Sequence, residues 1–368
     1  MVKSSWALPP RGRVPLAKPS VVEEAWRLVE ELGGRGLERA WRLVEGWRVE
    51  APRVRRALRL LQARWRDLAR PTVVALSCRA VGGDVERALR AAAPLILLSG
   101  GFDLHDDIVD RSVVRGARRR KTLLGLYGLE VTMLLGDALI VGGAWHLAST
   151  LVKEGLGEEE ASRILGLLFE LGSAEALELS FVKRLNVTPS RYLKVVEMKA
   201  ADVEAYARLG GALGGATQPQ LEALGRFGRR LGMIAIIRDD LEDLMNYRVE
   251  LKNRLLHESL PLPVLSALRS RRVSRRLRSI LSKWDLSVDE LKEVVKLVER
   301  GGGIEATLRE LRRLSREAEE ALEAVGGDVE GLRTLLKAAV PPLIEGGQLK
   351  APPRAGPGSS APRRPPCA

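Results

Sequence analysis

An all-α fold is predicted by two features of the sequence. Apolar residues recur with helical periodicity behind N-cap residues, and no segment alternates apolar and polar residues as a half-buried strand would. The 368 residues are 45% hydrophobic and 29% charged, which is an ordinary globular composition with enough chain to bury a large core. We therefore expect a helical domain over residues 20–347.

The expected helices begin at residues that suit an N-cap or a first turn. These residues are Ser20, Pro71, Asp84, Thr188 with Pro189, and Ser287 with Glu290. The helix that follows Asp84 is expected to reach Asp110. The segment 249–263 is expected to be irregular, because Pro261 and Pro263 prevent a helix from continuing.

Both ends of the chain differ in composition from the domain. Residues 1–19 form a basic arm that contains proline, and residues 348–368 form a tail rich in Pro, Gly, Ser and Arg, which we expect to be disordered. No run of about 18 consecutive apolar residues and no apolar signal-peptide region occur. We therefore expect no membrane span and a cytoplasmic location.

The formal net charge is +13, which raises the question of a nucleic-acid partner. The arginines are scattered over many helices, and only four Phe and four Tyr are present for base stacking, although there are seven Trp. We expect no nucleic acid. Asn and Gln are scarce while Arg, Glu and Leu are abundant. That bias indicates a thermophilic source.

Two acidic motifs stand far apart in the chain: Asp106-Asp107-Ile-Val-Asp110 and Asp239-Asp240-Leu-Glu-Asp243. Residues four apart on a helix share one face and lie about 6 Å apart along the axis, so each motif presents a pair of carboxylates. Each motif follows an apolar run, at 92–98 and 231–237, where unpaired carboxylates would be costly. Because Mg²⁺ takes one or two carboxylates together with water and phosphate, the six Asp residues are predicted to bind Mg²⁺ and handle a diphosphate.

This pattern resembles that of the trans-isoprenyl diphosphate synthases, or polyprenyl synthetases. The stretches 105–110 and 238–243 resemble the two aspartate-rich motifs of that family. Between them, Gly136-Asp137 resembles its Gly-Asp, Lys199 its substrate lysine, and Glu175 with Glu178 takes the place of its usual Gln and acid. The similarity spans roughly residues 50 to 270.

The resemblance implies a bundle of antiparallel helices around a central cavity and a homodimer. It also implies a reaction in which Mg²⁺ draws pyrophosphate from an allylic diphosphate and isopentenyl diphosphate attacks the resulting cation, giving a short linear prenyl diphosphate. The implied catalytic residues are Asp106, Asp107, Asp110, Lys199, Asp239 and Asp240. The implied substrate-binding residues are Arg70, Phe102, Arg115, Glu175 and Lys199. Asp243 is an implied metal ligand.

Phe102 bears on product length. It lies one turn before Asp106 on the same helix face, and Gly101 beside it leaves space. Phe102 is predicted to limit the growing chain, to three or four isoprene units by the resemblance. Packing in the core is the alternative role.

The chain departs from the family where isopentenyl diphosphate binds. Asp67 and Leu68 stand where the family has Lys and Arg, and only Arg70 and Pro71 of that stretch remain. Either Arg64, Arg66 or the basic run 118–121 supplies the missing charge, or the second substrate differs, or the chain is an inactive subunit that regulates a partner. A terpene cyclase is disfavoured, because such enzymes replace the second Asp-rich motif.

Overall fold

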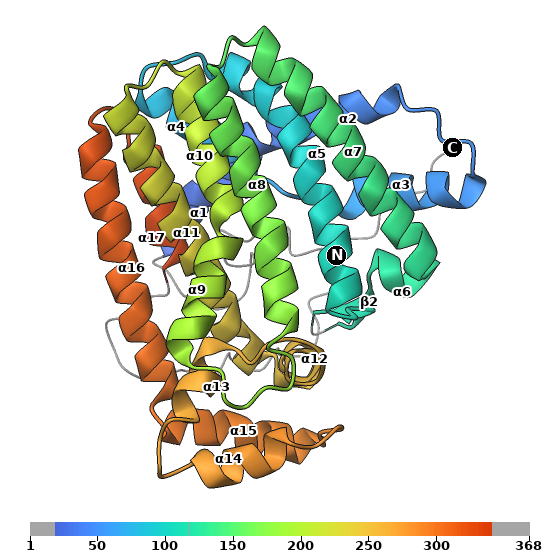
Figure 1. Ribbon diagram of the computed structural model, residues 1–368, viewed down its shortest axis with the longest axis vertical. Coiled ribbons are helices and arrows are strands. Elements are labelled where there is room, and N and C mark those ends of the chain that lie inside the picture. The colour runs from blue at the N-terminus through green and yellow to red at the C-terminus, as the bar shows by residue number, and fades with distance from the viewer. Residues whose placement is uncertain (1–18, 117, 341–368) are drawn as a thin grey trace, which may run out of the picture.

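The computed structural model describes residues 19–116 and 118–340, so the expected terminal arm and tail lie almost entirely outside the described residues. The described chain is a bundle of antiparallel helices, which confirms the predicted all-α class (Figure 1). The elements of its first half are α1 (Pro19–Leu28), η1 (Val29–Gly33, a π-helical turn), α2 (Gly34–Glu45), α3 (Pro52–Arg64), α4 (Ala69–Ala80), α5 (Val85–Val109), β1 (Val114–Arg115), β2 (Arg120–Lys121), α6 (Leu123–Tyr127), α7 (Leu129–Lys153) and α8 (Glu158–Leu179).

The second half contains long helices of the core and the shorter helices that close one end of the bundle. Its elements are α9 (Pro189–Lys199), α10 (Ala201–Leu213), α11 (Gln218–Met245), η2 (Tyr247–Leu251, also π-helical), α12 (Lys252–His257), α13 (Leu262–Ala267), α14 (Ser274–Leu281), α15 (Val288–Arg300), α16 (Gly303–Val325) and α17 (Glu330–Ala339). The long helices run side by side along the molecule, while α14 and α15 lie across its lower end (Figure 1).

The core is built on α5, which packs along α7, and on α10, which packs between α4 and α11. Residues 91–101 of α5 are buried without interruption, so this helix is covered on all sides. Helix α11 in turn packs against α16. Because α5 and α11 both run towards the same end of the bundle, they bring their acidic C-terminal turns to that end (Figure 1).

Glycines allow α5 and α7 to approach each other closely. A Cβ added to Gly101 would lie 2.7 Å from the carbonyl oxygen of Gly136, and one added to Gly143 would lie 2.9 Å from the carbonyl oxygen of Pro94. Gly101 is therefore filled by its neighbours. The expectation that it leaves space beside Phe102 is wrong, because α7 occupies that space.

Most of the expected helix starts are confirmed. The Asp84 carboxylate accepts a hydrogen bond from Glu86 N at 2.8 Å, Thr188 caps α9, and Ser287 with Glu290 forms a reciprocal capping box. The expected irregular segment 249–263 is wrong for most of its length. It continues as η2 and α12 as far as His257, because the first proline stands only at 261.

Helix α7 carries an unusual amount of exposed apolar surface. By length and composition it could cross a membrane, with a mean hydropathy of 1.4 over an 18-residue window of which 39% is buried. The criterion of about 18 consecutive apolar residues does not identify α7, because polar residues interrupt its apolar run. Exposed apolar side chains of α7 and the adjoining α8 are Leu129, Met133, Leu134, Val141, Trp145, Val152, Leu165, Phe169 and Leu179.

Candidate active site

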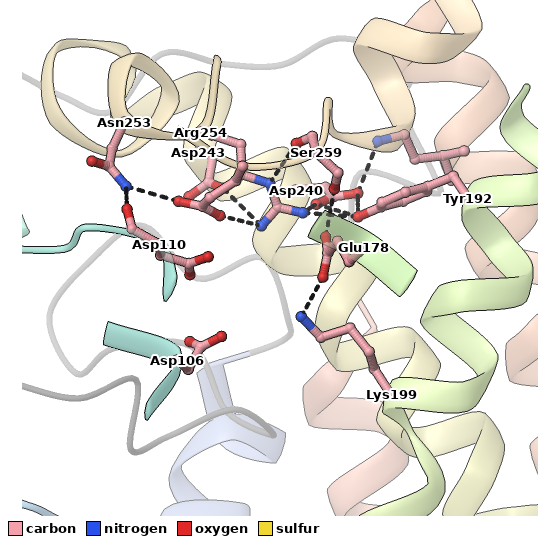
Figure 2. A network of polar contacts seen from close by, with 12 residues as sticks. Asp106, Asp110, Glu178, Tyr192, Lys199, Asp240, Asp243, Asn253, Arg254 and Ser259 are labelled. Carbon is pink, nitrogen blue, oxygen red and sulfur yellow. Dashed lines mark hydrogen bonds and ion pairs between the residues drawn. The ribbon is translucent and has the colours of Figure 1, made fainter. Parts of the chain in front are cut away.

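The first acidic motif lies at the C-terminal end of α5. Asp110 caps the helix, with its N–H bonded to the carbonyl oxygen of Asp106 at 2.9 Å, so the two residues keep helical spacing. The Asp106 side chain is 34% exposed, whereas the Asp107 side chain is fully buried. The motif therefore directs Asp106 and Asp110 to the side on which Lys199 lies (Figure 2) and turns Asp107 into the protein.

Arg115 holds the buried carboxylate of this motif. It belongs to β1, which pairs with β2 in an antiparallel hairpin after the motif. Its guanidinium lies 2.7 Å from Asp107 Oδ1 and 3.6 Å from Asp106 Oδ2. As expected from the sequence, the structure brings Arg115 and the first motif together. The basic run 118–121, in contrast, is exposed at and beside the hairpin tip.

Several carboxylates lie close to Asp110 in the first motif. The pKa of Asp110 is raised well above its ordinary value, first by burial and then by the charges of Asp106 and Glu258, while Lys199 and Arg115 oppose the shift. Glu258 follows α12, which belongs to the second half of the chain. The structure thus places an acid that the sequence did not single out near the first motif.

Lys199, the last residue of α9, lies near these carboxylates. Its Nζ lies 2.6 Å from Glu178 Oε2 (Figure 2). It also lies 3.0 Å from Glu175 Oε1, and both acids belong to α8. Burial, together with Asp106 and Glu178, raises the pKa of Glu175 to about 8 against the effect of Lys199. Although burial opposes it, Lys199 and Arg254 lower the pKa of Glu178 to about 2. Lys199 and Glu175 therefore meet Asp106 in one site, as expected.

The second motif, on α11, is more enclosed than the first. Asp240 is fully buried and accepts hydrogen bonds from Arg254 Nη2 at 2.9 Å, from Tyr192 Oη at 2.8 and 3.0 Å, and from the backbone N–H of Leu262 at 2.9 Å. Burial raises its pKa to about 6, even though Arg254 opposes the shift. Both oxygens of Asp240 are thus engaged by the protein itself.

The two outer acids of the second motif also have basic neighbours. Asp239 is 19% exposed and lies 3.3 Å from Arg238 Nη2, and Asp243 is 6% exposed and lies 3.8 Å from Arg254 Nη1. Arg254 and Tyr192 are site residues that the sequence analysis missed. The available signal was weak: Arg254 stands two residues after Lys252 in a segment of mixed polarity, and Tyr192 follows a helix cap like any core residue.

The carboxylates of the first motif are suited to a divalent metal ion that also binds the phosphate of a ligand. Among residues 19–116 and 118–340, no three Asp, Glu, His or Cys side chains converge closely enough to hold one metal ion. Mg²⁺ does not need such a cage, because it binds through one or two carboxylates and completes its octahedron with water and phosphate. The pair Asp106 and Asp110 provides such carboxylates, and Asp107 Oδ2 beside them is buried without a hydrogen-bond partner. These residues fit Mg²⁺.

Arg70 has a different environment from the one expected of a diphosphate ligand. Its guanidinium lies 2.8 Å from Asp202, 2.9 Å from Asp67 and 3.8 Å from Asp103, and its side chain is 13% exposed. Trp65 Nε1 donates a hydrogen bond to Asp103 at 2.9 Å and closes the cluster. The acid that replaces the expected lysine is therefore one of three carboxylates that enclose Arg70.

Phe102, which was predicted to limit product length, and its neighbour His105 lie on α5 near the first motif. Phe102 is half-buried and packs against the core, and His105 Nε2 lies 3.1 Å from Asp137 Oδ1, across the α5–α7 contact. Arg64 and Arg66, which were expected to replace the missing charge, are both exposed.

The comparisons with known proteins agree on one family. The sequence pattern of polyprenyl synthetases matches residues 64–298, nearly two thirds of the chain. The chain belongs to the polyprenyl synthetase family. It is 29% identical to a short chain isoprenyl diphosphate synthase of Methanothermobacter thermautotrophicus, over 69% of this chain and 80% of the relative. It is 30% identical to a (2E,6E)-farnesyl diphosphate synthase of Mycobacterium bovis, over 66% and 70%.

The fold of this polyprenyl synthetase matches that of solved structures. A geranylgeranyl pyrophosphate synthetase from Pyrococcus horikoshii superposes with a TM-score of 0.73 at 24% identity, over 86% of this chain and 97% of the other. The family and the fold implied by the two aspartate-rich motifs are thus confirmed. The protein is a transferase of the prenyltransferase kind.

Proposed function

We propose that this polyprenyl synthetase condenses an allylic diphosphate with isopentenyl diphosphate in a Mg²⁺-dependent reaction and releases a short linear prenyl diphosphate. The observation that carries the proposal is the meeting of Asp106 and Asp110 with Lys199 at one end of the bundle (Figure 2). Carboxylates for a metal ion and a fixed cation for phosphate therefore stand in the same site.

The charge balance of the site supports a cationic ligand. The contacts described above connect three basic side chains, Arg115, Lys199 and Arg254, to eight carboxyl groups. These are Asp106, Asp107, Asp110, Glu175, Glu178, Asp240, Asp243 and Glu258. Burial and this surplus of like charge raise the pKa of Asp110 and Glu175, and entering cations would oppose that shift. Divalent ions together with a diphosphate would complete the balance.

Each part of the site has a role in this reaction. Mg²⁺ held by Asp106 and Asp110 would supply Lewis acidity towards the departing pyrophosphate. Lys199 would hold a phosphate oxygen as a point charge, and Arg115 would keep the first motif in place through Asp107. The apolar walls, Phe102 among them, would exclude water from the allylic cation.

A second candidate differs only in the acceptor. The enclosure of Arg70 by three carboxylates favours an acceptor without a diphosphate, because an anion would have to displace Asp67, Asp103 or Asp202 from a largely buried guanidinium. Arg64 and Arg66 remain exposed nearby in sequence and are the residues that isopentenyl diphosphate would use instead.

We further propose a homodimer in the cytoplasm. The exposed apolar side chains of α7 and α8 include Trp145 at 68%, Val152 at 80% and Phe169 at 80%. A second copy would cover this surface, since contiguous exposed apolar patches mark interaction sites. Sedimentation of the purified protein tests the proposal, and a monomer at micromolar concentration would contradict it.

The reaction is tested with purified protein, Mg²⁺, labelled isopentenyl diphosphate and a set of allylic diphosphates, followed by sizing of the products. We expect label in chains of about three to four isoprene units. Asp106→Asn should abolish incorporation, while Asp289→Asn, at a highly exposed position, should leave it unchanged. Absence of label with every allylic diphosphate, together with transfer to an acceptor that lacks phosphate, would favour the second candidate.

A further inference from the structure

Arg254 occupies the centre of the second acidic motif. Its guanidinium lies 2.9 Å from Asp240, 3.3 Å from Glu258 and 3.8 Å from Asp243, and its side chain is 9% exposed (Figure 2). The three carboxylates come from α11 and from the residue after α12. Arg254 is thus a buried cation in the place where a metal ion between these carboxylates would otherwise lie.

The guanidinium is fixed from further sides. It donates hydrogen bonds to Tyr192 Oη at 2.9 Å and to the carbonyl oxygen of Ser259 at 3.3 Å. Tyr192 in turn donates to Asp240, and the hydroxyl of Ser259 donates to Glu178. A metal ion could bind Asp240 only after several of these bonds were broken, at a cost of about 1–3 kcal/mol for each buried group left unsatisfied.

The first motif also has a largely buried arginine, but that arginine contacts fewer carboxylates. The nearest guanidinium, that of Arg115, is directed to Asp107 and lies 3.6 Å from Asp106, whose side chain is one-third exposed. Asn253, the neighbour of Arg254, donates to the carbonyl oxygen of Asp110 and leaves its carboxylate to other partners. The two motifs are therefore unequal: Arg115 contacts Asp107 and Asp106 but not Asp110.

Arg254 contacts Asp240, Asp243 and also Glu258, and Asp239 of the second motif pairs with Arg238.

We propose that Arg254 takes the place of a metal ion at the second motif. As a positioning residue it neutralises Asp240 and Asp243, and the divalent cations of the reaction bind on the side of Asp106 and Asp110. This inference rests on the proposed Mg²⁺-dependent function, because it assumes that divalent cations enter the site. It restricts the binding of divalent cations to the carboxylates of the first motif. It also assigns Arg254 a role that the two Asp-rich motifs alone would not suggest.

The experiment counts bound Mn²⁺ by electron paramagnetic resonance, on the full chain with excess inorganic pyrophosphate and no prenyl substrate. Asp110→Asn should lose at least one ion or bind about tenfold more weakly. Asp243→Asn should keep the wild-type number of ions. Arg254→Gln should gain one ion through the freed carboxylates, and Arg254→Lys should not. Arg208→Gln is the matched control, because Arg208 of α10 is a buried arginine whose ion-pair partner, Glu160 of α8, belongs to neither acidic motif.

Loss of an ion in Asp243→Asn, or an unchanged number in a folded Arg254→Gln, overturns the inference. If Arg254→Gln does not fold, the comparison of Asp110→Asn with Asp243→Asn still decides, since the inference requires only the first to lose metal. Failure of the wild type to take up any Mn²⁺ would overturn the proposed metal dependence as well, whereas loss of an ion in Asp243→Asn would overturn this inference alone.

Discussion

Replacement of Arg70 by Gln separates a structural role of this residue from a role in substrate binding. The guanidinium compensates Asp67, Asp103 and Asp202, and Asp67 is fully buried. Removing one partner of a buried ion pair typically costs about 3–5 kcal/mol, because the remaining charges are left without compensation. At about 2 °C per kcal/mol for a chain of this size, we expect the melting temperature at pH 8 to fall by about 6–10 °C.

The pH dependence of this loss follows from the acids around Arg70. Burial raises the pKa of Asp103 to about 7, as does the charge of Asp67, and Arg70 opposes the shift. A carboxyl group whose folded pKa lies above its unfolded value costs stability as pH rises from about 4 to about 7. Without Arg70 that pKa rises further. The difference between wild type and Arg70→Gln should therefore be largest above pH 8 and smaller at pH 5, where Asp103 is protonated in both proteins.

The assay is thermal unfolding at pH 5 and pH 8, combined with the KM for isopentenyl diphosphate. Arg276→Gln is the control, because Arg276 forms an exposed pair with Glu293, and its melting temperature should match that of wild type. Arg70→Gln that melts within 1 °C of wild type at pH 8 but has a KM raised tenfold or more would refute the reasoning. Arg70 would then be a substrate ligand, as the sequence analysis expected.

Three further perturbations have defined outcomes. Phe102→Ala should shift the product distribution to longer chains, and unchanged product lengths would assign Phe102 to the core alone. Gly101→Ala should cost about 1–3 kcal/mol of unfolding free energy, because its Cβ would meet the backbone of Gly136, whereas Gly166→Ala, with open space around it, should not destabilise α8. Glu178→Gln should lower stability at pH 7. Since the pKa of Glu178 is lowered to about 2, the loss should disappear as pH falls from about 4.5 to about 2, and a constant loss would contradict the assignment.

Features set by local geometry could be predicted from the sequence. Asp84, Thr188 and Ser287 cap helices as expected, because an N-cap depends on a side chain and an N–H two or three residues away. The pairing of Asp106 with Asp110 follows from the helical repeat in the same way. The exception is the segment 249–263. There Pro261 and Pro263 end the helical structure only close to their own positions, and the chain stays helical as far as His257.

Contacts that depend on tertiary packing could not be predicted. Nothing near Arg254 in the sequence shows that Tyr192, from α9, and Asp240, from α11, will meet its guanidinium. The same holds for Gly101, which looks like free space in the sequence until α7 packs on it. The Arg70 cluster is similar: Asp67 is three residues away in the sequence, but Asp202 comes from α10, and the sequence analysis predicted neither contact.

The two clusters around Arg70 and Arg254 point to one change in how the protein manages charge. At both places a guanidinium, rather than a ligand, balances buried carboxylates, and a buried arginine costs several kcal/mol to desolvate unless such partners surround it. Each cluster therefore makes its own acids and base interdependent, so that neither can be lost alone. The least compensated acids are Asp106, whose side chain is one-third exposed, and Asp110 beside Lys199. A metal ion and a diphosphate would therefore be bound most favourably at the C-terminal end of α5. The second substrate would approach Arg70, whose charge is already neutralised by three carboxylates.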